Sequence, residues 1–432
     1  MAGQVNIQEL PCKNGRKIGI AELDNPSSLN ALSYDMLAQL HEALLHWQDD
    51  DDVVCVFLHG VGEKAFCAGG DVRSMYQVMD EARHQSDGVT DGDKAKSGQN
   101  GASSQSLGDV ATRHSMHSDK PHPGCRTTGF LTDYFALEYT TDYMIHTYLK
   151  PVVVWGQGIV MGGGIGLYIG ASHRISTPST RLAMPEITIG LYPDVGGTWF
   201  LNRLPQGVGL FLGLTGAQVN ATDALALSMT EHVLLPEQKS QLLSGLQHYD
   251  WEESEVYAGV TEVLDTLGSA ATSSHPDSQL IPHLPAIQAA CQYGSLSEIC
   301  RNIQAMPEII SNHAEPDKWL QQAKSSLAAG SPITAHICYR QITQFHEESL
   351  ADCFRMELTL SVRCGLLGEF YEGVKARLIE KTGQPNWRFK DVDSVDIAVI
   401  EQLFTPLWAD NEHPLQQLGL ISKGQPASAH YN

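Results

Sequence analysis

Residues 184–197 read Met184-Pro185-Glu186-Ile187-Thr188-Ile189-Gly190-Leu191-Tyr192-Pro193-Asp194-Val195-Gly196-Gly197. The run places two carboxylates, Glu186 and Asp194, in an otherwise apolar segment that prolines and glycines bracket. Burial raises the pKa of a carboxylic acid, and a second acid nearby raises it further. The pattern therefore indicates a pair of acids that could divide the roles of acid, base or nucleophile.

The composition indicates a globular protein with a sizeable core. The chain has 432 residues, of which 42% are hydrophobic, enough for one large domain or two to three ordinary ones. It carries 28 basic and 50 acidic residues, a net charge of -22. That balance argues against a nucleic-acid-binding protein, although a few local bases could still hold an anionic small ligand. No apolar run approaches the length of a membrane span.

The nine cysteines are scattered, odd in number and without a C-x-x-C pair. Cysteines in such an arrangement are typical of a reducing compartment. Together with the absence of a signal-like or Arg-rich start, they predict a cytoplasmic protein.

Strands and helices alternate in the first half of the sequence. Apolar runs predict strands over 16–23, 53–58, 152–155 and 173–176, and helical spacing follows Ser33. Beyond residue 212 the pattern is mostly helical. We expect an α/β fold with a core over residues 1–212 and a helical C-terminal region over 213–432 that completes it. Residues 80–129 are rich in polar residues and are expected to form a mobile insertion.

Two glycine-rich loops each follow a strand and precede a helix. They are Ala68-Gly69-Gly70-Asp71 and Met161-Gly162-Gly163-Gly164. Glycine lets the backbone approach a ligand closely, so an amide from each loop could polarise one carbonyl oxygen. The alternative is that both are simple tight turns, because neither matches the dinucleotide or P-loop motif.

A helical stripe over residues 132–148 carries Glu138 at or within its apolar face. The alternative is a solvated acid at the edge of the helix. Asp142, four residues on, faces the same side and could raise the pKa of Glu138, but we expect it to be exposed.

Taken together, these motifs resemble the crotonase superfamily of enoyl-CoA hydratases and isomerases, and within it the branch of 3-hydroxyisobutyryl-CoA hydrolases. The resemblance covers most of the chain except the polar insertion and the middle of the C-terminal half. The segments that carry it run over 64–71, 158–164, 184–197, Ser331-Pro332, Met356-Glu357, Glu372-Gly373-Val374 and Pro385-Asn386-Trp387.

The resemblance implies a core of repeated ββα units wound into a spiral, and it implies roles for individual residues. The amides of Gly70 and Gly163 would form an oxyanion hole around an acyl-CoA thioester carbonyl. Glu186 would be the principal catalytic carboxylate, as nucleophile or as general base, and Asp194 its partner. Glu138 would be a third acidic substrate contact. The first loop would add two further contacts, Ala68 and Asp71.

One departure from the resemblance bears on the reaction. Hydratases of this superfamily carry a second catalytic glutamate where this chain has Gly166. The resemblance therefore implies hydrolysis of a short 3-hydroxyacyl-CoA, with 3-hydroxyisobutyryl-CoA of valine catabolism as the expected substrate. Another hydratase or isomerase reaction is the alternative, and a non-catalytic acyl-CoA-binding subunit is a third. No cofactor is expected beyond the CoA of the substrate, and a homo-oligomer is possible.

Two groups of residues could suggest a metal, and both are better explained without one. The insertion contains His114, His117, His122 and Cys125, whose spacing matches no strong zinc template. Asp49 to Asp52 lacks the spaced ligands and turn glycine of a calcium loop and is typical of a solvated helix end. We expect no metal site, no membrane association and no nucleic acid.

Overall fold

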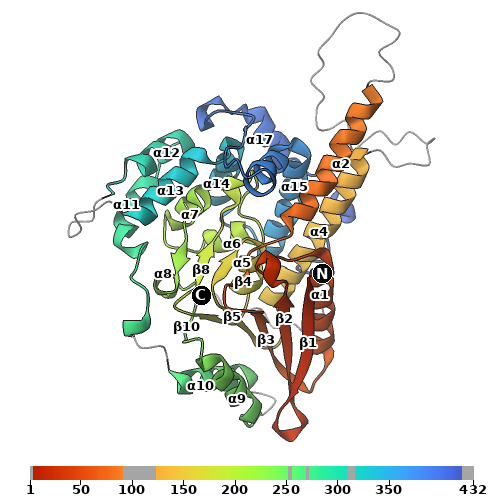
Figure 1. Ribbon diagram of the computed structural model, residues 1–432, viewed down its shortest axis with the longest axis vertical. Coiled ribbons are helices and arrows are strands. Elements are labelled where there is room, and N and C mark those ends of the chain that lie inside the picture. The colour runs from red at the N-terminus through yellow and green to blue at the C-terminus, as the bar shows by residue number, and fades with distance from the viewer. Residues whose placement is uncertain (1–2, 91–122, 252–254, 269–271, 309–316, 421–432) are drawn as a thin grey trace, which may run out of the picture.

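The computed structural model describes residues 3–90, 123–251, 255–268, 272–308 and 317–420 and contains two β-sheets (Figure 1). The larger sheet has the order β1-β2-β3-β5-β7-β10 and the smaller one β4-β6-β8-β9. The strands are β1 Gln4–Pro11, β2 Lys17–Asp24, β3 Val53–Gly60, β4 Ala65–Cys67, β5 Val152–Gly156, β6 Ile159–Met161, β7 His173–Ser176, β8 Arg181–Ala183, β9 Val219–Asn220 and β10 His232–Val233.

The core is built from a repeated ββα unit. In each repeat one strand joins the large sheet, the next joins the small sheet, and a helix follows. The repeats are β3-β4-α2, β5-β6-α5 and β7-β8-α6, with α2 Val72–Thr90, α5 Gly163–Ile169 and α6 Gly197–Leu201. Equivalent strands pair in parallel, so their carboxyl ends meet at one edge of each sheet. The predicted α/β fold with a ββα spiral is confirmed.

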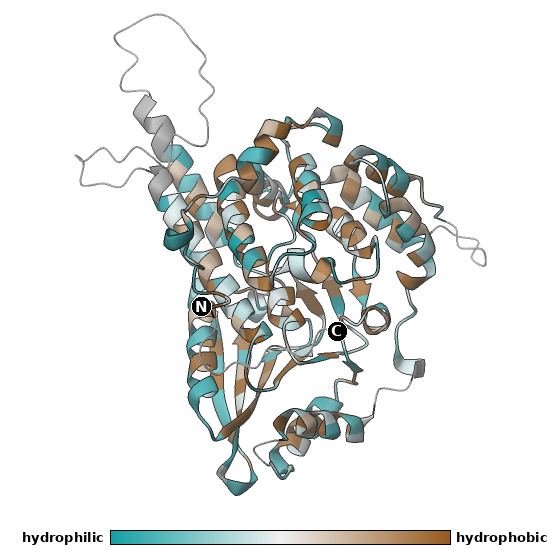
Figure 2. Ribbon diagram, turned by 180° about the vertical axis from the view of Figure 1, so that it is seen from behind, coloured by the Kyte–Doolittle hydropathy of each residue, from teal (hydrophilic) through white to brown (hydrophobic). Residues whose placement is uncertain are grey.

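Both faces of the large sheet are covered, which explains its continuous apolar strands. Every residue of β3 and β5 is buried. On one face, Phe57 and Trp155 pack with side chains of α9 Gln238–His248 and α10 Val256–Leu267. On the other face the sheet packs with α1 Tyr34–Asp49 and the main core. The central strands are mostly brown in the hydropathy colouring, whereas the outer helices carry teal residues (Figure 2).

Helices from the C-terminal half complete the main hydrophobic core, which is continuous across both halves of the chain. Helix α15 packs along α4 Pro123–His146, and α14 packs on α7 Val208–Thr215. Because α7 spans residue 212, the predicted boundary there falls inside a helix, and the two-part division of the chain stays a prediction. The remaining helices are α8 Ala221–Ala226, α11 Leu284–Cys291, α12 Leu296–Ala305, α13 Lys318–Ala329, α14 Pro332–Gln344, α15 Leu350–Leu367, α16 Glu369–Val374 and α17 Ile397–Phe404.

Helices α2 and α4 run side by side and flank the predicted insertion (Figure 1). Residues 80–90 and 123–129, which the composition assigned to the insertion, continue these two helices. Residues 91–122, with His114, His117 and His122, lie outside the described chain. None of the described helices is both long and apolar enough to cross a bilayer.

The packing of α7 against α6 gives a test of the fold. A Cβ added to Gly209 in α7 would lie 2.0 Å from the carbonyl oxygen of Leu201. We therefore expect Gly209→Ala to lower the free energy of unfolding by about 1–3 kcal/mol, because the clash outweighs the gain of about 1 kcal/mol in helix propensity. Gly129→Ala in α4 is the matched control, because nothing lies within 4 Å of its added Cβ. Urea unfolding should show no loss for the control; equal behaviour of the two variants would contradict the packing.

Candidate active site

The two glycine loops meet at the edge of the small sheet. Gly70 follows β4 and Gly163 follows β6, and these strands pair in parallel. A Cβ placed on Gly163 would lie 3.3 Å from the amide nitrogen of Gly70, so the two backbones are in contact. Neither amide donates a hydrogen bond to an acceptor within the described residues. Two unengaged N–H donors at one point can both donate to the same oxygen of a ligand.

Hydrogen bonds to the turn before α1 hold the first loop in place. Ala68 donates its amide to the carbonyl of Leu29 (3.0 Å), and Leu32 donates to the carbonyl of Gly69 (2.8 Å). Gly69 has φ +111°, a conformation that favours glycine. The carboxylate of Asp71 accepts from the amide (3.2 Å) and the hydroxyl (2.6 Å) of Ser74 and so caps the start of α2. In the described chain, Ala68 and Asp71 therefore shape the loop, and their predicted contacts with substrate stay predictions.

Three of the predicted acids are buried around the second loop. Glu138, Glu186 and Asp194 are 2%, 5% and 4% exposed. A Cβ on Gly163 would lie 2.4 Å from Oε1 of Glu138, and one on Gly162 would lie 2.8 Å from Oε1 of Glu186. The alternative of a solvated Glu138 at the edge of the helix is therefore wrong. Because Gly162 and Gly163 carry no side chains, the carboxyl groups of Glu186 and Glu138 can occupy the space beside the loop.

The local environment separates the protonation behaviour of these acids. Burial raises the pKa of Glu186 well above its usual value, and the charge of Asp194 adds to the effect. Burial, followed by the charge of Asp194, does the same to the pKa of Glu138. The pKa of Asp194 rises only to about 6, because a hydrogen bond from Tyr139 opposes the effect of burial. Asp194 therefore differs from the two glutamates in accepting a hydrogen bond that favours its charged form, an arrangement typical of acids with divided roles.

A network from the C-terminal half positions Asp194, and the sequence reasoning did not find it. The hydroxyl of Tyr139 donates to Oδ2 of Asp194 (2.7 Å) and contacts the hydroxyl of Ser361 in α15 (2.6 Å). Glu357 accepts from the amides of Gly196 (2.8 Å) and Thr198 (2.9 Å), which follow Asp194 directly. The only signal of this role was the Met356-Glu357 segment in the resemblance.

The expectation that Asp142 is exposed is wrong. Its side chain is fully buried, because this face of α4 packs against α5 and α15. A Cβ on Gly166 would lie 2.6 Å from Oδ2 of Asp142, so the carboxyl group fills the space that a side chain at position 166 would take. Helical spacing gave the correct direction for Asp142 but could not show that α5 approaches so closely.

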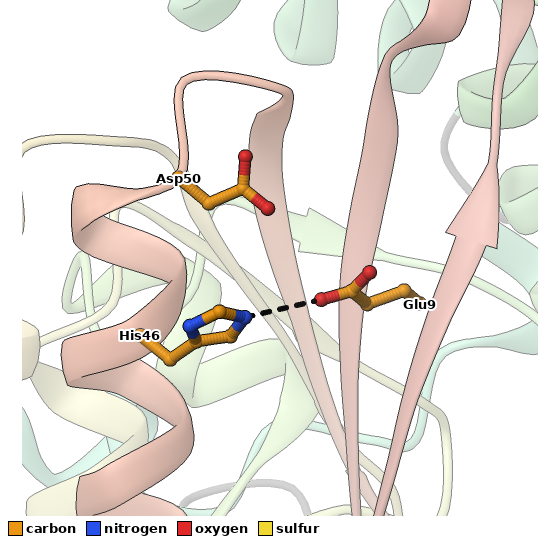
Figure 3. Close-up of side chains that lie close together, drawn as sticks. All are labelled: Glu9, His46 and Asp50. Carbon is orange, nitrogen blue, oxygen red and sulfur yellow. Dashed lines mark ion pairs between the residues drawn. The ribbon is translucent and has the colours of Figure 1, made fainter.

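One acidic cluster in the described chain comes near the geometry of a metal site. Glu9, His46 and Asp50 each offer an atom within 4.8 Å of the others (Figure 3). His46 lies 3.6 Å from Glu9, and the ammonium of Lys17 lies 3.1 Å from Glu9 and 3.2 Å from Asp50. Lys17 thus forms ion pairs with both carboxylates at the place a metal ion would take, and Asp50 belongs to the acidic run that the sequence assigned to a helix end.

Three comparisons relate the chain to known proteins. A family model described as enoyl-CoA hydratase/isomerase matches residues 18–93 and 100–404. The 3-hydroxyisobutyryl-CoA hydrolase, mitochondrial, of Danio rerio is 32% identical over 90% of this chain and 88% of its own. The small ribosomal subunit protein mS47 of Neurospora crassa is 29% identical over 87% of this chain and 66% of its own. An enoyl-CoA hydratase structure from Rhodobacter sphaeroides aligns with TM-score 0.71 and 26% identity, covering 94% of this chain and 98% of that one.

The predicted cytoplasmic location is wrong. Relatives from several animals, among them Danio rerio and Homo sapiens, carry the word mitochondrial in their names. The eight cysteines whose side chains the structure describes, all but Cys125, are unpaired, as the sequence suggested. Unpaired cysteines indicate a reducing rather than an oxidising compartment, but they cannot distinguish one reducing compartment from another.

Because Glu138 is buried, we expect that replacing it by a neutral residue stabilises the folded protein and that the gain depends on pH. Because the folded-state pKa of Glu138 is raised, the folded protein holds a proton that the unfolded chain loses above about pH 4.5. Stability contributed by this group therefore falls as pH rises. We expect Glu138→Gln to unfold at higher urea than the wild type at pH 7, with a gap that shrinks toward pH 4.5 by up to about 1.4 kcal/mol per pH unit. A gap that is constant with pH, or that grows toward acid pH, would contradict the burial of an acid there.

Proposed function

The chain belongs to the enoyl-CoA hydratase/isomerase family, and from this we propose that it hydrolyses a short-chain 3-hydroxyacyl-CoA thioester. Membership in the family confirms the resemblance drawn from the motifs and makes the chain a crotonase-family enzyme. We propose 3-hydroxyisobutyryl-CoA as substrate, with 3-hydroxyisobutyrate and CoA as products, as in valine catabolism. The names of the relatives support this substrate and a mitochondrial setting.

One observation carries the proposal: two unengaged backbone amides meet beside buried carboxylates. In the proposed mechanism the thioester oxygen lies between the amides of Gly70 and Gly163, whose backbones are in contact. Attack on the carbonyl places negative charge on that oxygen, and fixed dipoles stabilise the charge without reorganising. Loss of one such donor typically costs about 3–4 kcal/mol of transition-state stabilisation. The amides thereby supply the polarisation that hydrolysis requires.

Glu186 is the proposed reacting carboxylate. It either attacks the carbonyl carbon to form a mixed anhydride, or takes a proton from the water that attacks. In both cases the C–S bond breaks and the CoA sulfur receives a proton. With Glu186 as base, the oxygen of water ends in the product acid. With Glu186 as nucleophile, water then cleaves the anhydride, releasing the product acid and restoring the Glu186 carboxylate. The raised pKa of Glu186 makes its carboxylate a stronger base once ionised. Asp194 and Glu138 would hold the 3-hydroxyl group and assist the proton transfers.

An enoyl-CoA hydratase reaction is the second candidate. The structural likeness to the Rhodobacter sphaeroides enoyl-CoA hydratase favours it. Gly166 lacks the side chain that hydratases carry there, yet Asp142 brings a carboxyl group into the same space. The third candidate, a non-catalytic acyl-CoA-binding subunit, has a parallel in the ribosomal protein among the relatives. Retention of Glu186 next to both amides argues against it.

A thiol-release assay separates the three functions. Purified protein is given 3-hydroxyisobutyryl-CoA, 3-hydroxypropionyl-CoA and crotonyl-CoA, with free thiol and alkene absorbance followed together. We expect thiol release from the two hydroxyacyl thioesters and no loss of the crotonyl double bond. Hydration of crotonyl-CoA without thiol release would instead establish a hydratase. Binding of all three without turnover would establish a binding subunit.

The role of Glu186 is tested by a substitution that keeps its shape. We expect Glu186→Gln to lower kcat for hydrolysis by about 10²–10⁴-fold, because the amide can neither attack nor accept a proton. KM should change little, since the oxyanion amides remain. Glu237→Gln is the control, an exposed glutamate without a side-chain capping bond at the start of α9, and should keep wild-type kinetics. Substantial hydrolysis by Glu186→Gln would show that another group reacts.

A further inference from the structure

Three titratable side chains of α4 lie against three glycines of the α5 segment in matching order. We call this contact the α4–α5 seam, and its pairs are Glu138 with Gly163, Asp142 with Gly166 and His146 with Gly170. A Cβ added to these glycines would lie 2.4 Å from Oε1 of Glu138, 2.6 Å from Oδ2 of Asp142 and 2.6 Å from Cδ2 of His146. Residues four apart on a helix are neighbours, so the three side chains form one continuous row.

The row consists of polar atoms that lack partners. Oε1 of Glu138, both carboxyl oxygens of Asp142 and Nε2 of His146 are buried and make no hydrogen bond within the described chain. Buried polar groups in native proteins are almost always satisfied, and where protein atoms are missing an ordered water serves. A packing role alone does not explain Asp142, since a neutral side chain of the same shape would be cheaper to bury. The seam is therefore suited to hold water between titratable groups.

The row has two distinct ends. At one end Glu138 lies beside Gly70 and Gly163, where the thioester carbonyl is proposed to bind. At the other end His146 and Gly170 line a cavity of about 1850 Å³, which none of the predicted site residues lines. Asp142 is the link between the two ends.

We propose that Asp142 and His146 form a proton path from the reacting carboxylates to this cavity, a role that rests on the thioester hydrolysis proposed above. Hydrolysis breaks the C–S bond and forms a C–O bond to the oxygen of water, without any change of oxidation state. One proton of water ends on the CoA sulfur, and the second is set free when the product acid ionises. While CoA occupies the site, the α4–α5 seam gives that second proton a separate route to the cavity.

The neighbouring charges fit this direction of transfer. Asp142 faces three further acids, Glu138 on its own helix, Asp194 and Glu357 of α15, and the neutral thiol of Cys67 in β4. Burial, followed by the charges of the three acids, raises the pKa of Asp142 well above its usual value, which favours its protonated form. Arg174 of β7 and Arg203 face His146; together with burial, the larger cause, they lower its pKa to about 3. His146 is therefore neutral, and a neutral imidazole accepts a proton at one ring nitrogen while it donates from the other.

The first test needs no substrate. Infrared spectra of wild type minus Asp142→Asn should contain the carbonyl band of a protonated carboxyl group at pH 7. On transfer to D₂O this band should shift quickly in the wild type and more slowly in His146→Leu, which replaces the imidazole by an apolar group. Thr147→Ala is the control, because Thr147 also lines the cavity but its hydroxyl donates to the backbone carbonyl of Tyr143 (2.9 Å), within α4 and its last turn. Absence of the band, or equal exchange in all variants, overturns the proposal.

The second test uses turnover. We expect Asp142→Asn and His146→Ala to lower kcat by at least about 10-fold in weakly buffered solution, with little change in KM and with an altered pH profile of kcat. Imidazole added to the solution should enter the cavity and restore His146→Ala, but not Glu186→Gln. Wild-type kcat in both variants, or losses without rescue and without a changed pH profile, overturns the path. If the wild type hydrolyses no thioester, the proposed function fails, and the exchange experiment alone decides the path.

Discussion

The close approach of α4 to α5 is the constraint on which the rest of the site depends. Gly162, Gly163 and Gly166 carry no side chains, and the carboxyl groups of Glu186, Glu138 and Asp142 occupy the space that results. The same glycines leave the backbone bare where two amides meet. Burial raises the pKa of all three acids. The close packing at α5 therefore determines both the shape of the site and the pKa values of its acids. Desolvated acids destabilise the empty protein, as is typical of functional sites.

Helix α15, in the C-terminal half, holds the segment that follows Asp194 in position. Glu357 in α15 binds the amides of Gly196 and Thr198, and Ser361 contacts Tyr139, which in turn binds Asp194. Burial raises the pKa of Glu357 to about 8, while the hydrogen bonds it accepts oppose that rise. The loop with Asp194 is thus fixed by a helix distant in sequence.

Much of the site could be predicted from the sequence because its parts are local. Strand, glycine loop and helix follow one another within a few residues, and Glu138 stands out as an acid on an apolar face. Asp142 shows where prediction from sequence fails. Helical spacing gives the side of the helix on which Asp142 lies, but it does not show that a neighbouring helix buries that side. The ends of α2 and α4 that flank the insertion show a second limit, because a polar composition does not separate a helix from a loop. The cellular compartment is not encoded in cysteine spacing at all.

The long-range bond between Glu357 and the segment after Asp194 has a consequence for the order in which the enzyme becomes competent. Gly196 and Glu357 are 161 residues apart. A ribosome that has translated every glycine loop and every acid up to Asp194 has therefore produced all the chemical groups but not the geometry. Until α15 has emerged and docked, the segment after Asp194 lacks the carboxylate that binds its amides. Assembly of the site is thus coupled to the synthesis and docking of α15, a helix made long after the segment that it fixes.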